Sequence, residues 1–188
     1  MSTKEEIIEK AHTFLDERVA SLLSDVRYCI LKNENTEGWP APLPALLYCF
    51  STIDLMGALL DGNAISVGTI SKRALNYMRH VMNYPEKESE LLQDVFRHKI
   101  VHLAQLQPRV TKNNEIFAWR YFHNDREKHL KIEELNSVEN LFRFNVSIYS
   151  LAEDIATSVN GEGGYYERLN QKQSARNNFE TAYGQIFE

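Results

Sequence analysis

Residues 44–60 read PALLYCFSTIDLMGALL, a run that is apolar on nearly every helical face. Such a pattern is typical of a central bundle helix that other helices surround. Pro44 suits the first turn of this helix, and Asp54 is its only acid. Because the run is shorter than the roughly 20 residues that span a bilayer, we expect a core helix and not a membrane span.

Helical spacing on both sides of this run predicts further bundle helices. Apolar residues recur every three or four positions from residue 3 to about residue 31, which indicates a long amphipathic helix. The turn-rich stretch KNENTEGWPAPLP, residues 32–44, then interrupts the pattern. A third helix is predicted over 66–82 and a fourth from Pro85 onward. We therefore expect a mainly α fold, an antiparallel helical bundle over about 3–105.

The hydrophobic period changes after the fourth helix. Apolar and polar side chains alternate on both sides of Asn124-Asp125, which predicts a two-stranded β-hairpin over about 115–133. Its aromatic and basic residues suit either a stacking surface for single-stranded RNA or a half-buried ribbon on the bundle, and the alternation favours the ribbon. A packing helix is predicted over about 137–160, with Asn136 or Ser137 as its cap. The tail, 161–188, is either a short helix docked by its aromatic residues or a mobile arm.

Composition and charge narrow the class of protein. The 188 residues suffice for a single domain over 1–188, and 43% apolar with 25% charged residues is the balance of a soluble protein. The first residues are charged throughout without a signal-peptide core, so we expect a cytoplasmic protein. A net charge of -5 argues against nucleic-acid binding through the overall field, although a local basic patch still attracts phosphate. Cys29 and Cys49 lie in apolar patterns without metal-ligand spacing, which indicates buried free thiols.

An arginine and two histidines gather in the segment RHKIVH, residues 97–102. A histidine that titrates near neutral pH transfers the protons needed to cleave an RNA phosphodiester, and an arginine stabilises negative charge on the phosphate. This chemistry requires no metal or other cofactor. On a straight α-helix Arg97 and His102 lie about 140° apart, so they converge only if the helix distorts or if two copies meet in a symmetric dimer.

Two other interpretations of this segment stay open. A bundle helix often carries a buried arginine paired with an acid, and histidines are common at the edge of a core. Alternatively, His98 and His102 lie one helical turn apart, as in two-histidine metal sites. No glutamate follows His98 and no third ligand is evident in the sequence, so we predict no metal site. Glycine-rich phosphate loops and serine-nucleophile turns are also absent from the sequence.

The stretch FRHKIVHLAQ, residues 96–105, resembles the Arg-x4-6-His signature of the HEPN superfamily, helical-bundle proteins that include many metal-independent ribonucleases. The resemblance implies a homodimer in which two motifs face each other and RNA is cleaved by attack of its own 2′-hydroxyl. Arg97 would then stabilise the phosphate, and His102 would act as acid or base. His98 stands where asparagine or aspartate is more usual, and Asp54 would orient Arg97 as the acid of the preceding apolar helix.

The surroundings of the motif suggest how RNA is guided to it. Lys99 lies inside the motif, and Arg73 and Arg79 belong to the basic segment SKRALNYMRH, residues 71–80. More often such a segment is the solvated face of an amphipathic helix. The family suggests a toxin or phage-defence role, with an antitoxin or another protein as partner. The alternative function is a non-catalytic HEPN-like binding or assembly module in which Arg97 and Asp54 form a structural ion pair.

Overall fold

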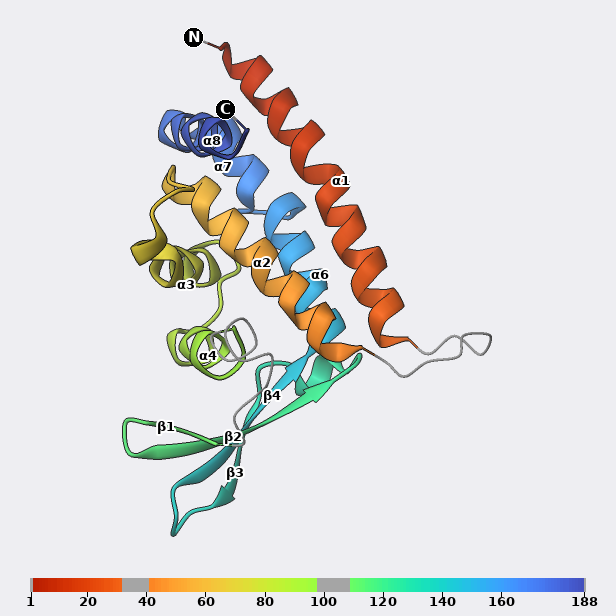
Figure 1. Ribbon diagram of the computed structural model, residues 1–188, viewed down its shortest axis with the longest axis vertical. Coiled ribbons are helices and arrows are strands. Elements are labelled where there is room, and N and C mark those ends of the chain that lie inside the picture. The colour runs from red at the N-terminus through yellow and green to blue at the C-terminus, as the bar shows by residue number, and fades with distance from the viewer. Residues whose placement is uncertain (1, 32–40, 98–108, 188) are drawn as a thin grey trace.

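The computed structural model describes residues 2–31, 41–97 and 109–187, so His98, Lys99 and His102 lie outside the described residues. The chain is mainly helical with a small four-stranded mixed sheet, which confirms the predicted mainly α class. Figure 1 shows the helices gathered on one side of the sheet, with the sheet at the lower end of the molecule. Buried residues of the helices and of the sheet form one continuous core.

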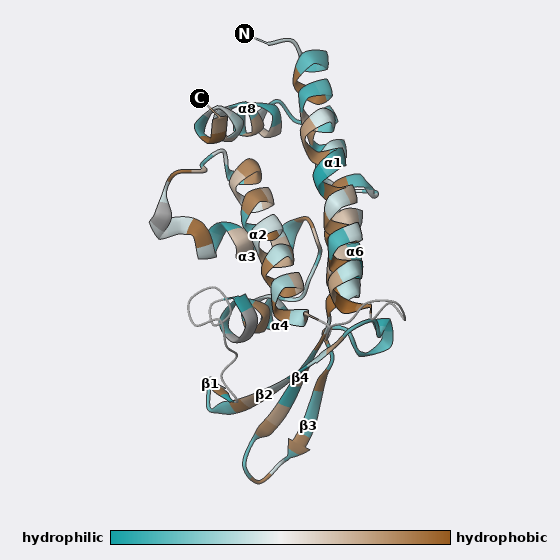
Figure 2. Ribbon diagram, turned by 45° about the vertical axis from the view of Figure 1, so that its right-hand side comes forward, coloured by the Kyte–Doolittle hydropathy of each residue, from teal (hydrophilic) through white to brown (hydrophobic). Residues whose placement is uncertain are grey.

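Helix α1 (Lys4–Ile30) forms where the sequence predicts it. Thr3 and Glu6 make a capping box, in which each side chain accepts a hydrogen bond from the other residue's backbone N–H. Its buried residues follow one stripe at spacings of three and four: Ile7, Ala11, Leu15, Val19, Leu22, Val26 and Ile30. Figure 2 shows polar residues recurring over the rest of its surface. Helix α1 therefore covers one side of the core along its whole length.

Helix α2 (Pro42–Asp61) is the central helix, in contact with α1 and with the helices α3, α6 and α8 described below. With 20 residues it is long and apolar enough to cross a membrane, so the expectation that it is too short is wrong. However, 56% of its apolar window is buried inside the structure. This burial is typical of the core helix of a soluble protein.

Two helical stretches follow α2 and lead to the motif. The first joins η1 (Val67–Thr69) directly to α3 (Ile70–His80). The second joins α4 (Glu86–Leu91) to η2 (Leu92–Arg97), which is a π-helix. The fourth helix therefore begins where the sequence predicts it, and its second half is wound as a π-helix.

The C-terminal region adds helices to the other end of the bundle. It comprises α6 (Ile148–Asn160), α7 (Tyr165–Gln171) and α8 (Gln173–Phe187). Tyr165, Leu169 and Phe179 are fully buried, so aromatic residues dock the tail on the core as one of the two predictions stated. The alternative prediction of a mobile arm is wrong. Figure 1 shows both α7 and α8 near the N-terminal end of α1.

The sheet corrects the predicted hairpin over 115–133. Its strand order is β1-β2-β4-β3, where β1 is Val110–Lys112, β2 is Glu115–Phe122, β4 is Leu141–Ser147 and β3 is Ile132–Asn136. Strand β2 pairs antiparallel with β1 and parallel with β4, whereas β3 pairs antiparallel with β4. The two strands of the predicted hairpin are therefore separated by β4 and do not pair with each other.

Asparagine residues lie at both turns of this region, the turn between β1 and β2 and the turn between β3 and β4. The two-residue turn that joins β1 to β2 is Asn113-Asn114, and both residues have positive φ, as a tight hairpin turn requires. Asn136 accepts hydrogen bonds from the N–H groups of Val138 and Glu139, which is also how a helix cap behaves. The residue thus begins the turn between β3 and β4. The predicted helix over 137–160 is wrong for 141–147, which form β4, and is correct from Ile148.

A close approach between α2 and α3 depends on Gly57. A Cβ atom placed on Gly57 would lie 2.7 Å from the carbonyl oxygen of Arg73 and 2.8 Å from its carbonyl carbon. Both atoms belong to the backbone of α3, which cannot rotate away as the end of a side chain does. The absence of a side chain at Gly57 therefore sets the distance between α2 and the helix that carries Ser71 and Arg73.

We expect Gly57→Ala to destabilise the protein by about 1–3 kcal/mol, because the added methyl overpacks the α2–α3 contact. Gly68→Ala is the control, since a Cβ at Gly68 meets no atom within 4 Å. Urea unfolding of both variants measures the difference. Equal stability of Gly57→Ala and the wild type would contradict the close contact.

A buried polar cluster joins the sheet to the bundle. The hydroxyl of Tyr84 donates to Oδ2 of Asp154 at 2.6 Å, and Nε2 of His129 lies 3.2 Å from the same oxygen. Arg126, in η3 (Arg126–Lys128), binds the other carboxylate oxygen of Asp154. Burial raises the pKa of Asp154, but the hydrogen bonds from His129, Tyr84 and Arg126 outweigh it and leave the pKa below its usual value.

We expect Asp154→Asn to cost about 1.5–3 kcal/mol at pH 7, because hydrogen bonds to a charged group are lost. The pKa of Asp154 is lower in the folded than in the unfolded chain. Its stabilisation is therefore present above the unfolded value of about 3.9 and is lost as the pH falls through the folded value. Unfolding in urea at pH 7 and pH 3 should show a smaller effect at pH 3. An equal effect at both pH values would refute this, and Asp25→Asn, the same change at an exposed residue of α1, is the control.

Candidate functional site

The site lies where η2 ends, at the arginine that begins the RHKIVH segment. A π-helix is wound with i→i+5 hydrogen bonds, so each bond spans one more residue than in the α-helix that precedes it. This change rotates Arg97 away from the position that an α-helix would give it. Arg97 and His102 lie on different sides of a straight α-helix, so they meet only if the helix is distorted or if two copies form a dimer. The distortion is present before Arg97, and His102 lies outside the described residues.

Arg97 is bound to Asp54, the acid that the sequence analysis selected. Its Nε and Nη2 atoms donate to Oδ2 of Asp54 at 3.2 Å and 2.9 Å, and the arginine is only 6% exposed. The two residues are 43 positions apart in the sequence, so this contact fixes the end of η2 against α2. The predicted ion pair is therefore present, and it supplies the negative charge that a buried guanidinium requires.

Ser71 connects the same arginine to α3. Nη1 of Arg97 donates to the Ser71 hydroxyl oxygen at 3.4 Å, and Nε2 of Gln93 donates to that oxygen at 3.1 Å. Gln93 precedes Arg97 by four positions, a spacing from which the sequence could have suggested a shared face. No sequence signal identifies Ser71, which lies on a different helix. Thus α2, α3 and η2 each contribute one or more polar side chains to the cluster around Arg97.

Two acceptor atoms of this cluster are unsatisfied. Oδ1 of Asp54 and Oε1 of Gln93 are buried and have no hydrogen-bond partner among the described residues. Burial also raises the pKa of Asp54 above its usual value, although the hydrogen bond and charge of Arg97 and the charge of Arg73 act in the opposite direction. A hydroxyl or N–H donor that reaches the cluster would therefore find acceptors beside the guanidinium.

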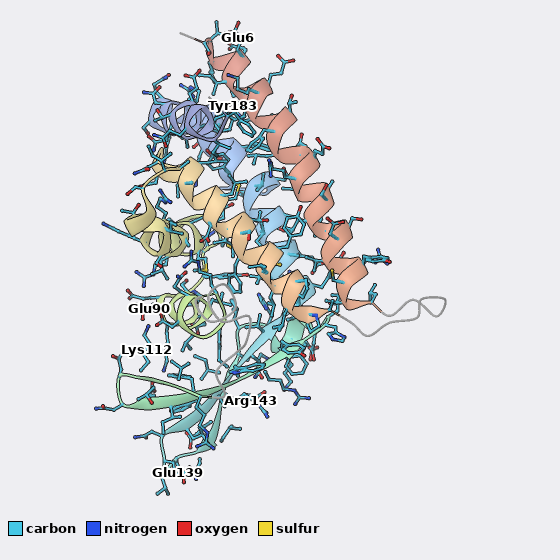
Figure 3. The ribbon with its side chains drawn as sticks, in the orientation of Figure 1. Glu6, Glu90, Lys112, Glu139, Arg143 and Tyr183 are labelled. Atoms are coloured by element: carbon cyan, nitrogen blue, oxygen red, sulfur yellow. The ribbon has the colours of Figure 1, made fainter. Side chains whose placement is uncertain are left out.

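A second set of contacts holds η2 against the β1 hairpin. Nζ of Lys112 lies 2.8 Å from Oε2 of Glu90 and 2.6 Å from Oδ2 of Asp94. Figure 3 shows Glu90 on α4 and Lys112 on β1 facing the same gap between the helix and the strand. The hydrogen bond from Lys112 also lowers the pKa of Glu90. The π-helix is therefore anchored by charged contacts at Asp94 and again at Arg97.

The two arginines predicted to bind RNA both belong to α3. Arg73 is 5% exposed, and its Nη1 donates to the backbone carbonyl of Asn63. Arg79 forms ion pairs with Glu86 at 3.2 Å and Glu90 at 2.8 Å, so its charge is compensated. Neither arginine is hydrogen-bonded to the cluster around Arg97. The third predicted RNA-binding residue, Lys99, lies outside the described residues, as do His98 and His102.

Metal and thiol chemistry find no support in the described part of the chain. Within residues 2–31, 41–97 and 109–187, no three His, Cys, Asp or Glu side chains converge as metal ligands do. The proposed His98/His102 metal pair falls outside those ranges. Cys29 and Cys49 are both free, and Cys49 is buried as predicted, whereas Cys29 is only partly buried. Burial raises the pKa of the Cys49 thiol, which keeps it protonated.

Three aromatic residues on one face of β2 pack against the core. Phe117 is fully buried, whereas Trp119 and Tyr121 are partly buried against the core with rings stacked at a centroid distance of 6.0 Å. These side chains are packed on the core as the half-buried interpretation expected, although the two-stranded ribbon itself does not form. These three aromatic residues are therefore not assigned to RNA.

Comparisons of the chain with protein-family models, with curated proteins and with solved structures gave no match.

We expect Asp54→Asn to destabilise the protein by about 3–5 kcal/mol, because it leaves the Arg97 charge buried without its partner. Arg97→Met should cost less, since the Asp54 side chain is 24% exposed against 8% for Arg97. The variant that carries both substitutions should lose less free energy of unfolding than the sum of the two single losses. Equilibrium unfolding in urea measures this cycle.

A cycle of Arg79→Met and Glu90→Gln serves as the control, because that ion pair is about 30% exposed on each side. Its coupling energy should stay within about 1 kcal/mol. Equal coupling energies in the two cycles would contradict a special role of the buried Arg97–Asp54 pair.

Proposed function

We propose that this protein is a metal-independent endoribonuclease of the HEPN type. In this proposal the helices form a HEPN-like bundle in the cytoplasm, and two copies form a homodimer with a composite cleft. The observation that carries the proposal is the ion pair between Arg97 and Asp54. The resemblance implies this pair, and the fold joins the two residues across 43 positions of sequence.

Arg97 would act on the phosphate through the part of its guanidinium that Asp54 does not hold. Asp54 binds Nε and Nη2, whereas Nη1 has the hydroxyl of Ser71, at 3.4 Å, as its one acceptor among the described residues. Such a long hydrogen bond is weak, and Ser71 itself is exposed. A phosphate oxygen can therefore replace Ser71 as the acceptor of Nη1 while Asp54 keeps the arginine in position.

Proton transfer in this mechanism belongs to His102. As a general base it takes the proton of the RNA 2′-hydroxyl, whose oxygen attacks the adjacent phosphorus while the bond to the 5′-oxygen breaks. The leaving oxygen receives a proton from a second acid, for which the His102 of the other protomer in the homodimer is the candidate. The products are a 2′,3′-cyclic phosphate and a 5′-hydroxyl, so no metal or external nucleophile enters the balance. His98 and Lys99, next to Arg97, would contact the same strand.

The burial of Arg97 favours a second candidate function. An arginine that is 6% exposed, with two donor atoms committed to a carboxylate, has the features of a structural ion pair. In that case the chain is a non-catalytic HEPN-like module that binds a partner, for example an antitoxin. Arg97 would then stabilise the bundle and would not contact RNA.

Cleavage of a mixed labelled RNA pool in excess EDTA distinguishes the two functions. We expect wild-type protein to cut, and His102→Ala to lose about 100-fold or more of the rate, because general acid–base catalysis contributes that much. Arg97→Lys should also lose activity, since lysine keeps the charge but not the planar donor pattern. His123→Ala, at an exposed histidine beyond β2, is the control that should retain full activity.

Each variant must be compared at matched fraction folded, because Arg97 also supports the bundle. If no protein cuts, or if all four cut equally, the ribonuclease proposal is wrong. The binding-module function then remains.

A further inference from the structure

A cavity of about 330 Å³ lies over one face of α3, apart from the cluster around Arg97. Basic residues dominate its charged lining: Lys72, Arg73 and Arg79 carry positive charge, whereas Asp61 is its only acid. His80 and Asn76 add polar atoms to the wall. The lining of the cavity is thus positively charged, whereas the formal net charge of the whole chain is -5.

The spacing of α3 produces this lining. Lys72, Asn76, Arg79 and His80 stand at positions i, i+4, i+7 and i+8, which form one stripe of an α-helix. Asp61, the last residue of α2, lies at the rim of the same cavity. A single helix therefore presents its cationic side chains to one partly open cavity.

Arg73 is the residue that distinguishes this cavity from a basic surface. It is 5% exposed, yet no carboxylate lies within 4.0 Å of its guanidinium in the described part of the chain. Nη1 donates to the Asn63 carbonyl, and Nε is buried without a hydrogen-bond partner among those residues. A buried cation without a carboxylate in direct contact is costly, even though the charge of Asp54 acts on Arg73 from beyond 4.0 Å, so the position favours an anion that completes its hydrogen bonds.

The other charges leave the cavity net positive. Arg79 is compensated by Glu86 and Glu90, but Lys72 is exposed and forms no ion pair with any described residue. Among the described residues that line the cavity, Asp61 is the one acid beside Lys72 and Arg73. Two cations that form no ion pair with a described residue, with the amide of Asn76 beside them, suit a phosphate group, which accepts several hydrogen bonds at once.

We propose that this cavity binds a phosphate group, with Arg73 and Lys72 as its principal ligands. If the protein is the proposed ribonuclease, this phosphate belongs to the RNA backbone beside the cleaved bond. The assignment of the phosphate to RNA therefore rests on the proposed function. Ser71, which contacts Arg97, directly precedes Lys72 on α3. A strand held at the cavity is therefore guided along α3 toward Arg97.

Binding to the cleavage-inactive His102→Ala protein tests the proposal. Fluorescence anisotropy with a labelled single-stranded RNA gives the affinity, and inorganic phosphate is tested as competitor and, by calorimetry, as ligand. We expect Lys72→Glu to weaken binding of both probes at least fivefold. The matched control is Lys172→Glu, which makes the same charge change at an exposed residue outside the cavity. Arg73→Met should weaken binding further if its melting temperature stays near that of the parent.

The outcomes separate this site from the ribonuclease. Loss of phosphate and RNA binding in Lys72→Glu but not in Lys172→Glu supports the site, with RNA as its source of phosphate. Loss of phosphate binding alone supports a site for free phosphate. If neither probe binds, or if the two lysine variants behave alike, the proposal is wrong. A wild-type protein that binds phosphate at Lys72 but cuts no RNA would refute the ribonuclease and leave this site standing.

Discussion

The buried ion pair between Arg97 and Asp54 is the interaction on which the arrangement around the motif depends. A guanidinium that is 6% exposed loses most of its hydration, and the loss is tolerable only with a carboxylate close by. This requirement ties the end of the π-helix to the middle of α2. The contact to Ser71 adds α3 to the same arrangement, so the positions of α2, α3 and the π-helix are fixed relative to one another.

One face of α2 serves both the ion pair and the contact with α3. Asp54 and Gly57 are three residues apart, and residues with this spacing lie on the same side of a helix. Asp54 holds Arg97, while Gly57 admits the backbone of Arg73 at a distance that no other residue would allow. Ser71 and Arg73 then diverge from one turn of α3. The first meets the arginine of the motif, and the second lines the phosphate cavity.

The sequence predicted those features that depend on a repeated local pattern. The buried stripe of α1 and the apolar length of α2 determine their helices, and Asp54 was identifiable as the only acid of an apolar run. The prediction of a hairpin over 115–133 was wrong because alternation identifies a strand but not the strand that pairs with it. The parallel pairing of β2 with β4 joins segments that are distant in the sequence. The prediction that Asn136 caps a helix was wrong because a turn and a helix cap use the same hydrogen bonds. Ser71 carries no signal at all, since only the fold brings it to Arg97.

The end groups of RNA fragments produced by the wild-type protein in EDTA test the central claim most directly. Attack by the 2′-hydroxyl, with Arg97 on the phosphate, leaves a 2′,3′-cyclic phosphate on one fragment and a 5′-hydroxyl on the other. We predict these ends, and we predict that they disappear in the His102→Ala protein. Fragments with 3′-hydroxyl and 5′-phosphate ends, or no fragments from folded protein, would contradict the claim.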